Sequence, residues 1–318
     1  MSSLTITTLV VTIVAVLGAS ACRTGASAPQ TDAPSASVPA STSAQPSDVP
    51  AVITALYPLQ FAAESVAGTS ASVTRLASAN AEPHDLELSP QQVAALREAD
   101  LVVYIPGLMP TLDDAVAQLP AERVLDVSSV VDLRDDVSPD PHVWLDPTAL
   151  ASIGTAVAQR LGTLNPVNAS ALTAGGARFA QQMDDLDQAW QTGTTDCARR
   201  DLFVTHDAYG YLADRYGLNE VSVLGRNPEQ EPSAARLADV ADLIRARGAT
   251  TIFAEPAADS TASNPVADTL ATATGITTAT LDPLEIPPAT GDYTAAMRRN
   301  LAVVQLALGC TVATSGAR

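Results

Sequence analysis

Three histidines are the residues of this chain best suited to specific chemistry. The 318 residues contain no histidine besides His84, His142 and His206, and each has an aspartate within two positions. Neutral imidazole binds zinc, copper, iron or nickel, whereas magnesium and calcium prefer oxygen ligands. Three imidazoles and one carboxylate would complete a tetrahedral zinc shell. We therefore interpret the three histidines as ligands of one transition-metal site.

The spacing of the histidines does not establish such a site by itself. Long stretches of sequence separate them, so only tertiary folding can bring them together. Each histidine, taken singly, is also compatible with an ordinary hydrogen-bonded position in a loop or a core. The elements that carry them decide between these interpretations.

Short apolar runs alternate with helical patterns along most of the chain. The expected strands cover 51–56, 72–76, 101–104 and 123–127, and later 201–205, 220–224, 250–254 and 277–281. The expected helices cover 90–99, with Ser89 as N-cap, 208–216, 232–247, 264–274 and 292–308. Alternating strands and helices indicate parallel α/β sheets. A long polar helical pattern at 165–193 separates the two series, so we predict an α/β fold with two parallel-sheet lobes, 50–164 and 197–313, joined by a long rigid helix.

Two candidate ligands directly follow predicted strands of the second lobe. His206 comes after the strand 201–205, and Asp282 comes after the strand 277–281. Open α/β sheets bind ligands at the carboxyl ends of their strands. His84 and His142 belong to the first lobe by sequence. Two ligands from each lobe would place a metal in the cleft between the lobes.

The first residues are typical of an export signal. The apolar stretch 9–17 is too short to span a bilayer, and small residues follow it up to Cys22. Small residues before a cysteine resemble a bacterial lipobox, so we expect a signal peptide at 1–21 and lipidation of Cys22, with cleavage without lipidation as the alternative. The segment 22–49 has no apolar periodicity, which predicts a disordered tether. The mature protein is then expected on the extracytoplasmic face of the cell membrane.

The ionisable residues exclude several classes of function. All 17 basic residues are arginines, and 35 acidic residues bring the formal net charge to −18. Without lysine there is no Schiff-base chemistry and no lysine-containing phosphate loop. The acidic balance argues against nucleic acid as a partner. Besides Cys22 the chain contains only Cys197 and Cys310. This pair predicts a disulfide in an exported protein, with thiolate metal ligation as the alternative.

Six segments together resemble a known family. They are 83–90, 98–102, 140–147, 205–212, 252–256 and 281–284, and they contain all three histidines. In order and spacing they resemble the metal-specific substrate-binding proteins of bacterial zinc and manganese ABC importers. The resemblance implies two α/β lobes bridged by a rigid helix, a metal between them, and delivery of that metal to a membrane permease. We accordingly expect a lipid-anchored monomer that is not an enzyme.

The resemblance also implies a ligand set. Carried over by position, the ligands are His84, His142, His206 and a carboxylate that we place at Asp282. Glu255 is the alternative, as a fourth ligand, as a hydrogen-bond acceptor for a ligand imidazole, or as a cap. A third histidine in place of glutamate favours Zn(II) over Mn(II) as the transported ion. A manganese- or iron-binding relative or a surface adhesin remains as the alternative function, and a zinc hydrolase is less favoured.

Two residues that follow His142 are expected to have structural roles. Trp144 should pack beneath the ligand His142, and Asp146 should cap the helix that Pro147 begins. Many zinc-selective members of the family carry a histidine-rich loop between the first two ligands. The corresponding segment here, 130–139, has three aspartates and no histidine. The sequence therefore argues against an auxiliary loop that gathers metal.

Overall fold

A computed structural model describes five stretches of the chain. They are 49–77, 83–134, 139–226, 231–256 and 264–311. The expected signal peptide, Cys22 and nearly all of the expected tether lie outside the described residues. In the described part, no helix has both the length and the apolar character needed to cross a membrane.

The first sheet contains four parallel strands in the order β2-β1-β3-β4. The strands are β1 (Ala51–Thr54), β2 (Ser72–Arg75), β3 (Leu101–Tyr104) and β4 (Val124–Asp126). Apolar side chains of the two central strands, β1 and β3, are buried, as expected for a parallel sheet covered on both faces. All four strands lie within the ranges that the sequence predicts.

The second sheet repeats this arrangement with the parallel order β6-β5-β7-β8. Its strands are β5 (Asp201–Val204), β6 (Asn219–Ser222), β7 (Thr251–Ala254) and β8 (Thr277–Thr280). In both sheets the first strand of the lobe lies inside the sheet, with the second strand on one side and the third on the other. The predicted fold of two parallel-sheet α/β lobes is confirmed.

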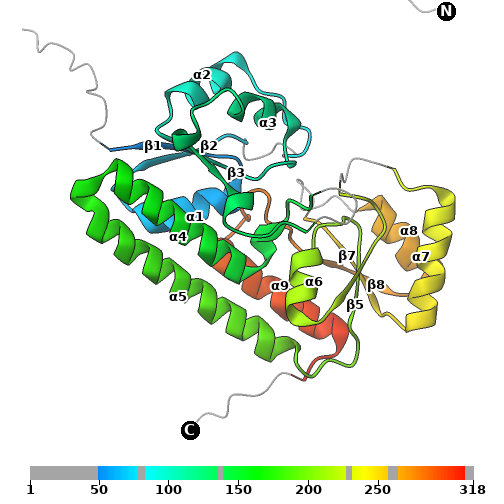
Figure 1. Cartoon of the computed structure of the whole chain (residues 1–318). Coiled ribbons are helices and arrows are strands. Elements are labelled where there is room, and N and C mark those ends of the chain that lie inside the picture. Colours follow the sequence, from blue (N-terminus) through cyan, green and yellow to red (C-terminus); the bar gives the residue numbers. More distant parts are fainter. Residues whose placement is uncertain (1–48, 78–82, 135–138, 227–230, 257–263, 312–318) are drawn as a thin grey trace, which may run out of the picture. The chain divides into compact units, whose positions relative to one another are not determined.

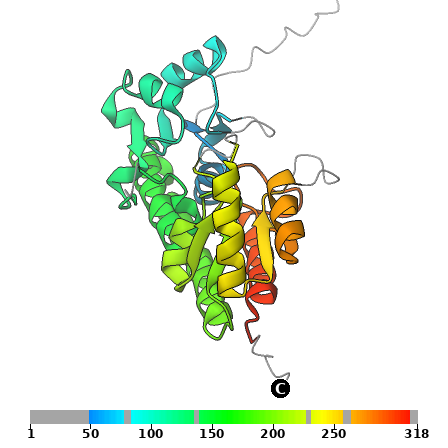
Figure 2. The same ribbon diagram turned by 90° about the vertical axis from the view of Figure 1, so that its right-hand side faces the viewer.

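Helices cover both faces of each sheet (Figure 1). The first lobe has α1 (Tyr57–Ala67), α2 (Pro90–Glu98) and α3 (Pro110–Val116), with short 3-10 turns at Ala121–Arg123 and Val127–Ser129. The second lobe has α6 (Gly210–Tyr216), α7 (Ala234–Arg247), α8 (Pro265–Thr274) and α9 (Tyr293–Leu308). Figure 2 shows α7 and α8 side by side on the outer side of the second lobe. The predicted cap of α2 is present, because the Ser89 hydroxyl accepts a hydrogen bond from the backbone of Gln92 at 3.3 Å.

Two long helices lie side by side and connect the lobes (Figure 1). They are α4 (Pro147–Leu164) and α5 (Ala169–Thr194), joined by a 3-10 turn at Pro166–Asn168. Gly154 of α4 faces the ring of Phe179 of α5 so closely that a Cβ atom would overlap it. Helix α5 contacts α1 of the first lobe and both α6 and α9 of the second. It occupies the place of the linking helix that the sequence predicts at 165–193.

One apolar core extends through the first sheet, the two long helices and part of the second lobe. A second, smaller cluster lies between β5, β7 and the outer helices α7 and α8. The second lobe is further closed by the Cys197–Cys310 disulfide, which agrees with the predicted pairing. Cys197 follows α5 and Cys310 follows α9, so the bond joins the two ends of this lobe.

Candidate metal centre

His142 is held rigidly by an aspartate two residues before it. The Asp140 carboxylate oxygen Oδ1 accepts hydrogen bonds from His142 Nδ1 at 2.8 Å and from the His142 backbone at 3.1 Å. His142 is fully buried, and a 3-10 turn, Val143–Leu145, begins directly after it. A histidine that gives Nδ1–H to a carboxylate has its Nε2 lone pair free for a metal.

His84 and His206 approach His142 from two other segments. His84 lies in the loop before α2, and its Nε2 is 3.3 Å from Nε2 of His142. His206 follows β5 and is 1% exposed. The ring centres of the three histidines are 5.0–5.7 Å apart. The structure therefore brings together all three predicted histidines at the junction of the two lobes.

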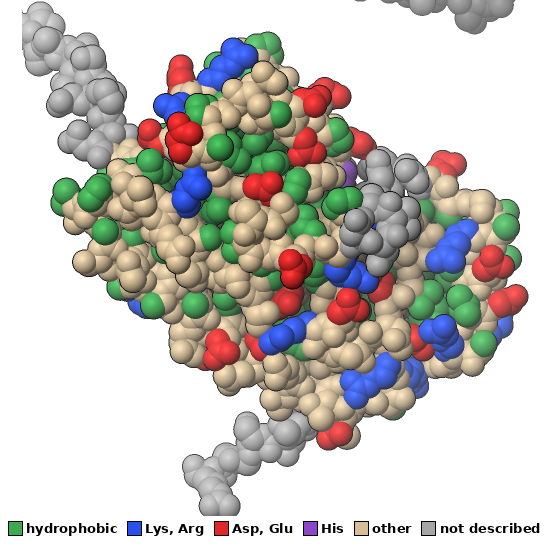
Figure 3. Space-filling model, viewed as in Figure 1, with side chains coloured by type: hydrophobic (Ala, Val, Ile, Leu, Met, Phe, Trp, Pro, Cys, Tyr) green, Lys and Arg blue, Asp and Glu red, His purple; other side chains and the backbone are tan. Residues whose placement is uncertain are grey.

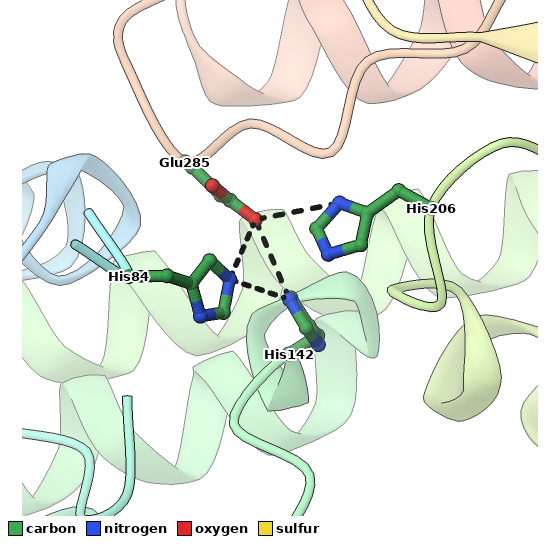
Figure 4. Close-up of side chains that lie close together, drawn as sticks. All are labelled: His84, His142, His206 and Glu285. Carbon is green, nitrogen blue, oxygen red and sulfur yellow. Dashed lines mark hydrogen bonds and ion pairs between the residues drawn. The ribbon is translucent and has the colours of Figure 1, made fainter. Parts of the chain in front are cut away.

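The carboxylate in this cluster is Glu285 (Figure 4). Its Oε1 is 3.5 Å from His84 Nε2, 3.4 Å from His142 Nε2 and 4.0 Å from His206 Nδ1. Glu285 is 5% exposed, in a loop that follows β8. In the face drawn in Figure 3, histidine surface appears only as a small area beside residues that are not described. A charged side chain this buried needs compensating partners, and the imidazoles supply them.

The spacing of these atoms suits a tetrahedral ion. With Zn–N and Zn–O bonds of about 2.0–2.1 Å, two ligand atoms of a tetrahedral shell lie about 3.3–3.4 Å apart. The distances among His84, His142 and Glu285 are 3.3, 3.4 and 3.5 Å. The contact with His206 is longer, at 4.0 Å. Three imidazoles and one carboxylate are a suitable donor set for a zinc ion, which His206 would join by moving and exchanging one of its present hydrogen-bond partners.

Asp282, the carboxylate expected in this cluster, has another role. Its Oδ1 accepts a hydrogen bond from the backbone of Leu284 at 2.8 Å, and its backbone pairs with the side chain of Asn300. Leu284 adopts a left-handed conformation with φ 61°. This conformation turns the chain inward one residue before Glu285. The placement of the fourth carboxylate at Asp282 is therefore corrected: Asp282 stabilises the turn, and Glu285 reaches the histidines.

Glu255 contacts His206 but does not belong to the group of four residues that could hold a metal. Its Oε1 is hydrogen-bonded to His206 Nδ1, while His206 Nε2 lies 2.9 Å from the carbonyl oxygen of Arg226. Of the three roles considered for Glu255, the geometry corresponds to a hydrogen-bond acceptor for the imidazole of His206. Glu255 ends its strand beside His206, since β5 and β7 are neighbours in the sheet.

Electrostatic coupling keeps the cluster charged. Burial disfavours the protonated form of His142, but hydrogen bonds to Asp140 and Glu285 outweigh it and raise the pKa of His142 to about 9. Burial also opposes ionisation of Glu285, yet its bonds to His142 and His84 hold the pKa of this carboxyl well below its usual range. The pKa of His206 is raised because the bond to Glu255 outweighs burial. In the metal-free cluster, protonated imidazoles therefore supply the positive charge that a bound divalent cation would supply.

The expected structural residues are found beside the cluster. The ring of Trp144 packs on His142 at 5.2 Å between centroids, and Trp144 is fully buried. The Asp146 side chain accepts a hydrogen bond from the backbone of Thr148 at 2.8 Å and caps α4. Both predictions are confirmed.

Two parallel α/β lobes, a connecting helix and a buried histidine–carboxylate cluster at their junction define a two-lobed binding protein. The family model for the zinc-uptake complex component A, periplasmic, matches residues 52–307. The chain belongs to this family of substrate-binding components, which is not a family of enzymes.

Several relatives are known. The zinc-binding protein AdcA of Streptococcus pyogenes is 29% identical over 288 residues, covering 80% of this chain and 55% of the relative. The zinc-uptake protein ZnuA of Bacillus subtilis is 29% identical over 254 residues, covering 74% of this chain and 78% of the relative. The chain thus spans about half the length of the first AdcA relatives that it matches.

Solved structures share the fold. The laminin-binding protein of Streptococcus agalactiae, described as an adhesin with metal-transporting activity, superposes with a TM-score of 0.74 at 28% identity, covering 82% of this chain and 99% of that one. Zn(II)-bound AdcA of Streptococcus pneumoniae gives a TM-score of 0.72 at 28% identity, covering 82% of this chain and 58% of that one.

Proposed function

We propose that this protein captures Zn(II) outside the cytoplasm and delivers it to the permease of an ABC importer. The observation that carries the proposal is the buried group of His84, His142, His206 and Glu285. These four residues are the proposed ligands. Membership in a zinc-uptake family supports zinc as the cargo, and Zn(II)-bound relatives of the same fold support it further.

The contribution of two proposed ligands by each lobe favours metal transport over catalysis. His84 and His142 come from the first lobe, and His206 and Glu285 come from the second. A shell of four protein ligands leaves no open position for a reacting water. Separation of the lobes would remove half of the shell together, which provides a route for release at the permease.

We further propose that the mature protein is lipidated at Cys22 and tethered to the membrane through residues 22–49. Exported status is supported by the periplasmic family description, and the relative from Streptococcus pneumoniae is named a zinc-binding lipoprotein. The protein would act as a monomer, since the proposed site is built within one chain. Mass spectrometry of the membrane fraction and light scattering of the soluble body test these two points.

Metal stoichiometry and zinc-dependent growth test the transport role. Native mass spectrometry of metal-stripped protein titrated with Zn(II) and Mn(II) should give one zinc per chain and preference for zinc. His142→Ala and His206→Ala should lose high affinity. A deletion strain should grow poorly under zinc chelation, recover with added zinc, and be complemented by the wild-type gene but not by His206→Ala. Complementation by His206→Ala at normal expression would contradict the proposal.

Adhesion is a second candidate function. A structural neighbour with 99% of its length matched is described as both an adhesin and a metal transporter. Laminin binding by the purified protein, measured with and without zinc, would establish this activity separately from uptake.

A further inference from the structure

A group of polar residues joins the segment before His142 to the second lobe. Among the described residues, Arg134 makes two ion pairs. Its Nε lies 3.0 Å from Asp214 Oδ2, and its Nη1 lies 3.2 Å from Asp140 Oδ2. Its guanidinium also lies 5.7 Å from the ring centre of Tyr211. Tyr211 and Asp214 belong to α6 of the second lobe, whereas Arg134 and Asp140 belong to the chain of the first. The arginine therefore bridges the two lobes.

The Tyr211 hydroxyl contacts both Arg134 and Asp140. It accepts a hydrogen bond from the backbone of Arg134 at 2.7 Å and donates one to the carbonyl oxygen of Asp140 at 2.7 Å. The Asp140 backbone in turn donates to the carbonyl oxygen of Arg134 at 2.7 Å. Residues 134 and 140 are thus held together, and one hydroxyl fastens both to α6.

Asp140 transmits this arrangement to the proposed ligand His142. One carboxylate oxygen of Asp140 faces Arg134, and the other accepts the hydrogen bond of His142 Nδ1. Asp140 is 2% exposed, so water cannot readily replace either partner. Charge-assisted bonds of this kind are among the stronger hydrogen bonds in proteins. A continuous set of contacts therefore leads from α6 through Asp140 to the imidazole.

We propose that Arg134 and Tyr211 are positioning residues that couple helix α6 to His142 and thereby set the rate at which metal leaves the site. This inference rests on the proposed function. While the bridge is intact, Asp140 holds His142 in its binding orientation. When the lobes separate, the contacts of Arg134 with Asp214 and of the Tyr211 hydroxyl with the backbones of Arg134 and Asp140 break together. Asp140 then loses the support that orients His142. Metal release is then linked to lobe separation.

Gly210 provides an independent sign of this arrangement. It is the first residue of α6, and a Cβ atom at this position would overlap Nη1 of Arg134. The backbone of Gly210 is not left-handed, so alanine would suit its conformation. Gly210→Ala therefore displaces the guanidinium while every polar group of the bridge remains in the chain. This variant therefore tests the position of the Arg134 guanidinium without removing its charge.

The test is the rate of zinc loss from the mature protein, measured by stopped-flow transfer to an excess of a chromogenic chelator. Arg134→Ala, Tyr211→Phe and Gly210→Ala should still bind one zinc per chain but release it faster, by up to roughly the ten- to hundredfold loss of metal affinity that follows removal of a group bonded directly to a ligand. Arg134→Lys, which can reach one carboxylate at a time, should give an intermediate rate. Arg247→Ala is the matched control, because Arg247 pairs with Asp201 at 2.7 Å at the opposite end of β5 from His206.

The rates decide the inference separately from the zinc stoichiometry, which tests the proposed function. Thermal unfolding of the metal-free variants should resemble that of the wild type, which excludes a general loss of folding as the cause. Wild-type release rates in Arg134→Ala and Gly210→Ala would overturn the positioning role. A wild-type rate in Tyr211→Phe beside fast release in Arg134→Ala would overturn the coupling to α6.

Discussion

Trp144 donates its indole N–H to the carbonyl oxygen of Pro283 at 2.7 Å, and this bond joins two loops from different lobes. The Trp144 ring also packs on His142, and Pro283 stands two residues before Glu285. On the other side, the Tyr293 hydroxyl donates to the Trp144 carbonyl oxygen at 2.5 Å. One indole therefore contacts the proposed ligand His142 and the loop that carries the proposed ligand Glu285.

Intrinsic fluorescence should report metal binding through Trp144. The chain has only two tryptophans, and the other, Trp190 of α5, is stacked on Tyr216 of α6. We expect zinc to change the emission of the wild type and of Trp190→Phe but not of Trp144→Phe. Titration of the three proteins measures this directly. A zinc-dependent change that persists in Trp144→Phe would place the metal elsewhere.

The identity of the carboxylate ligand is tested by a matched pair of variants. Glu285→Gln keeps the size of the side chain but removes its charge, so zinc affinity should fall by about 2–4 kcal/mol, because a ligand of the shell is neutralised and the imidazoles lose their anion. Asp282→Asn keeps a hydrogen-bond acceptor for Leu284 and should bind zinc nearly as well as the wild type. Competition with a chelator of known affinity gives both values. The reverse order of effects would restore Asp282 as the ligand.

Zinc binding should release protons and strengthen as the pH rises. The sequence alone places this dependence near the ordinary histidine pKa of about 6.5. The pKa of His142 is raised to about 9, so this imidazole is protonated at neutral pH without metal. Affinity should fall about tenfold per pH unit below 9 for each displaced proton. Calorimetry at pH 7.5 in buffers of different ionisation enthalpy measures the release, and buffer-independent heats would contradict the prediction.

The same titration affects the stability of the metal-free protein. The folded pKa of His142 lies above its unfolded value, so the folded state binds the extra proton. The stabilisation is complete below about pH 6.5 and is lost as the pH rises through about 9. Urea unfolding of metal-free protein should show this decline, and saturation with zinc should reduce it. Equal declines with and without zinc would assign the effect to other groups.

Reduction of the disulfide should weaken the second lobe without removing the metal site. The Cys197–Cys310 bond spans 113 residues of sequence and lies outside the histidine cluster. A double Cys→Ser variant should lose about 2–4 kcal/mol of stability and still bind one zinc. Denaturant unfolding and zinc titration check these two expectations. Loss of zinc binding in a folded double variant would show that the bond supports the site.

Strong local patterns explain why most of the fold follows from the sequence. The eight strands of the described residues coincide with the predicted strands to within a residue or two, although β2 and β8 are largely polar, and Ser89 marks the start of α2. Helix α1 was harder to foresee, because the buried residues Ala55 and Leu56 continue the apolar run of β1 directly into it. No turn residue separates the strand from the helix. Periodicity alone cannot divide such a run.

The sequence predicts the histidines of the candidate site better than its carboxylate, because histidine is rare in this chain and carboxylates are common. Histidine occurs only at the three clustered positions, so residue type alone identifies them. The chain has many carboxylates, and the position after a strand favours Asp282 over Glu285. The choice depends on the conformation of Leu284 and on the bonds of Asn300 to the Asp282 backbone, and these belong to tertiary structure. The bridge from Arg134 to α6 likewise joins residues far apart in sequence.

The left-handed backbone of Leu284 bears on which ions the protein accepts. A leucine in this conformation is costly unless its surroundings hold it, and Leu284 is fully buried. Glu285 therefore follows a residue whose unusual backbone conformation is held by the surrounding core. Calcium and magnesium need six or more oxygen ligands or retained waters. The cluster offers one carboxylate and three imidazoles, and its carboxylate is attached to a backbone held in one conformation, so we expect it to bind these hard cations poorly.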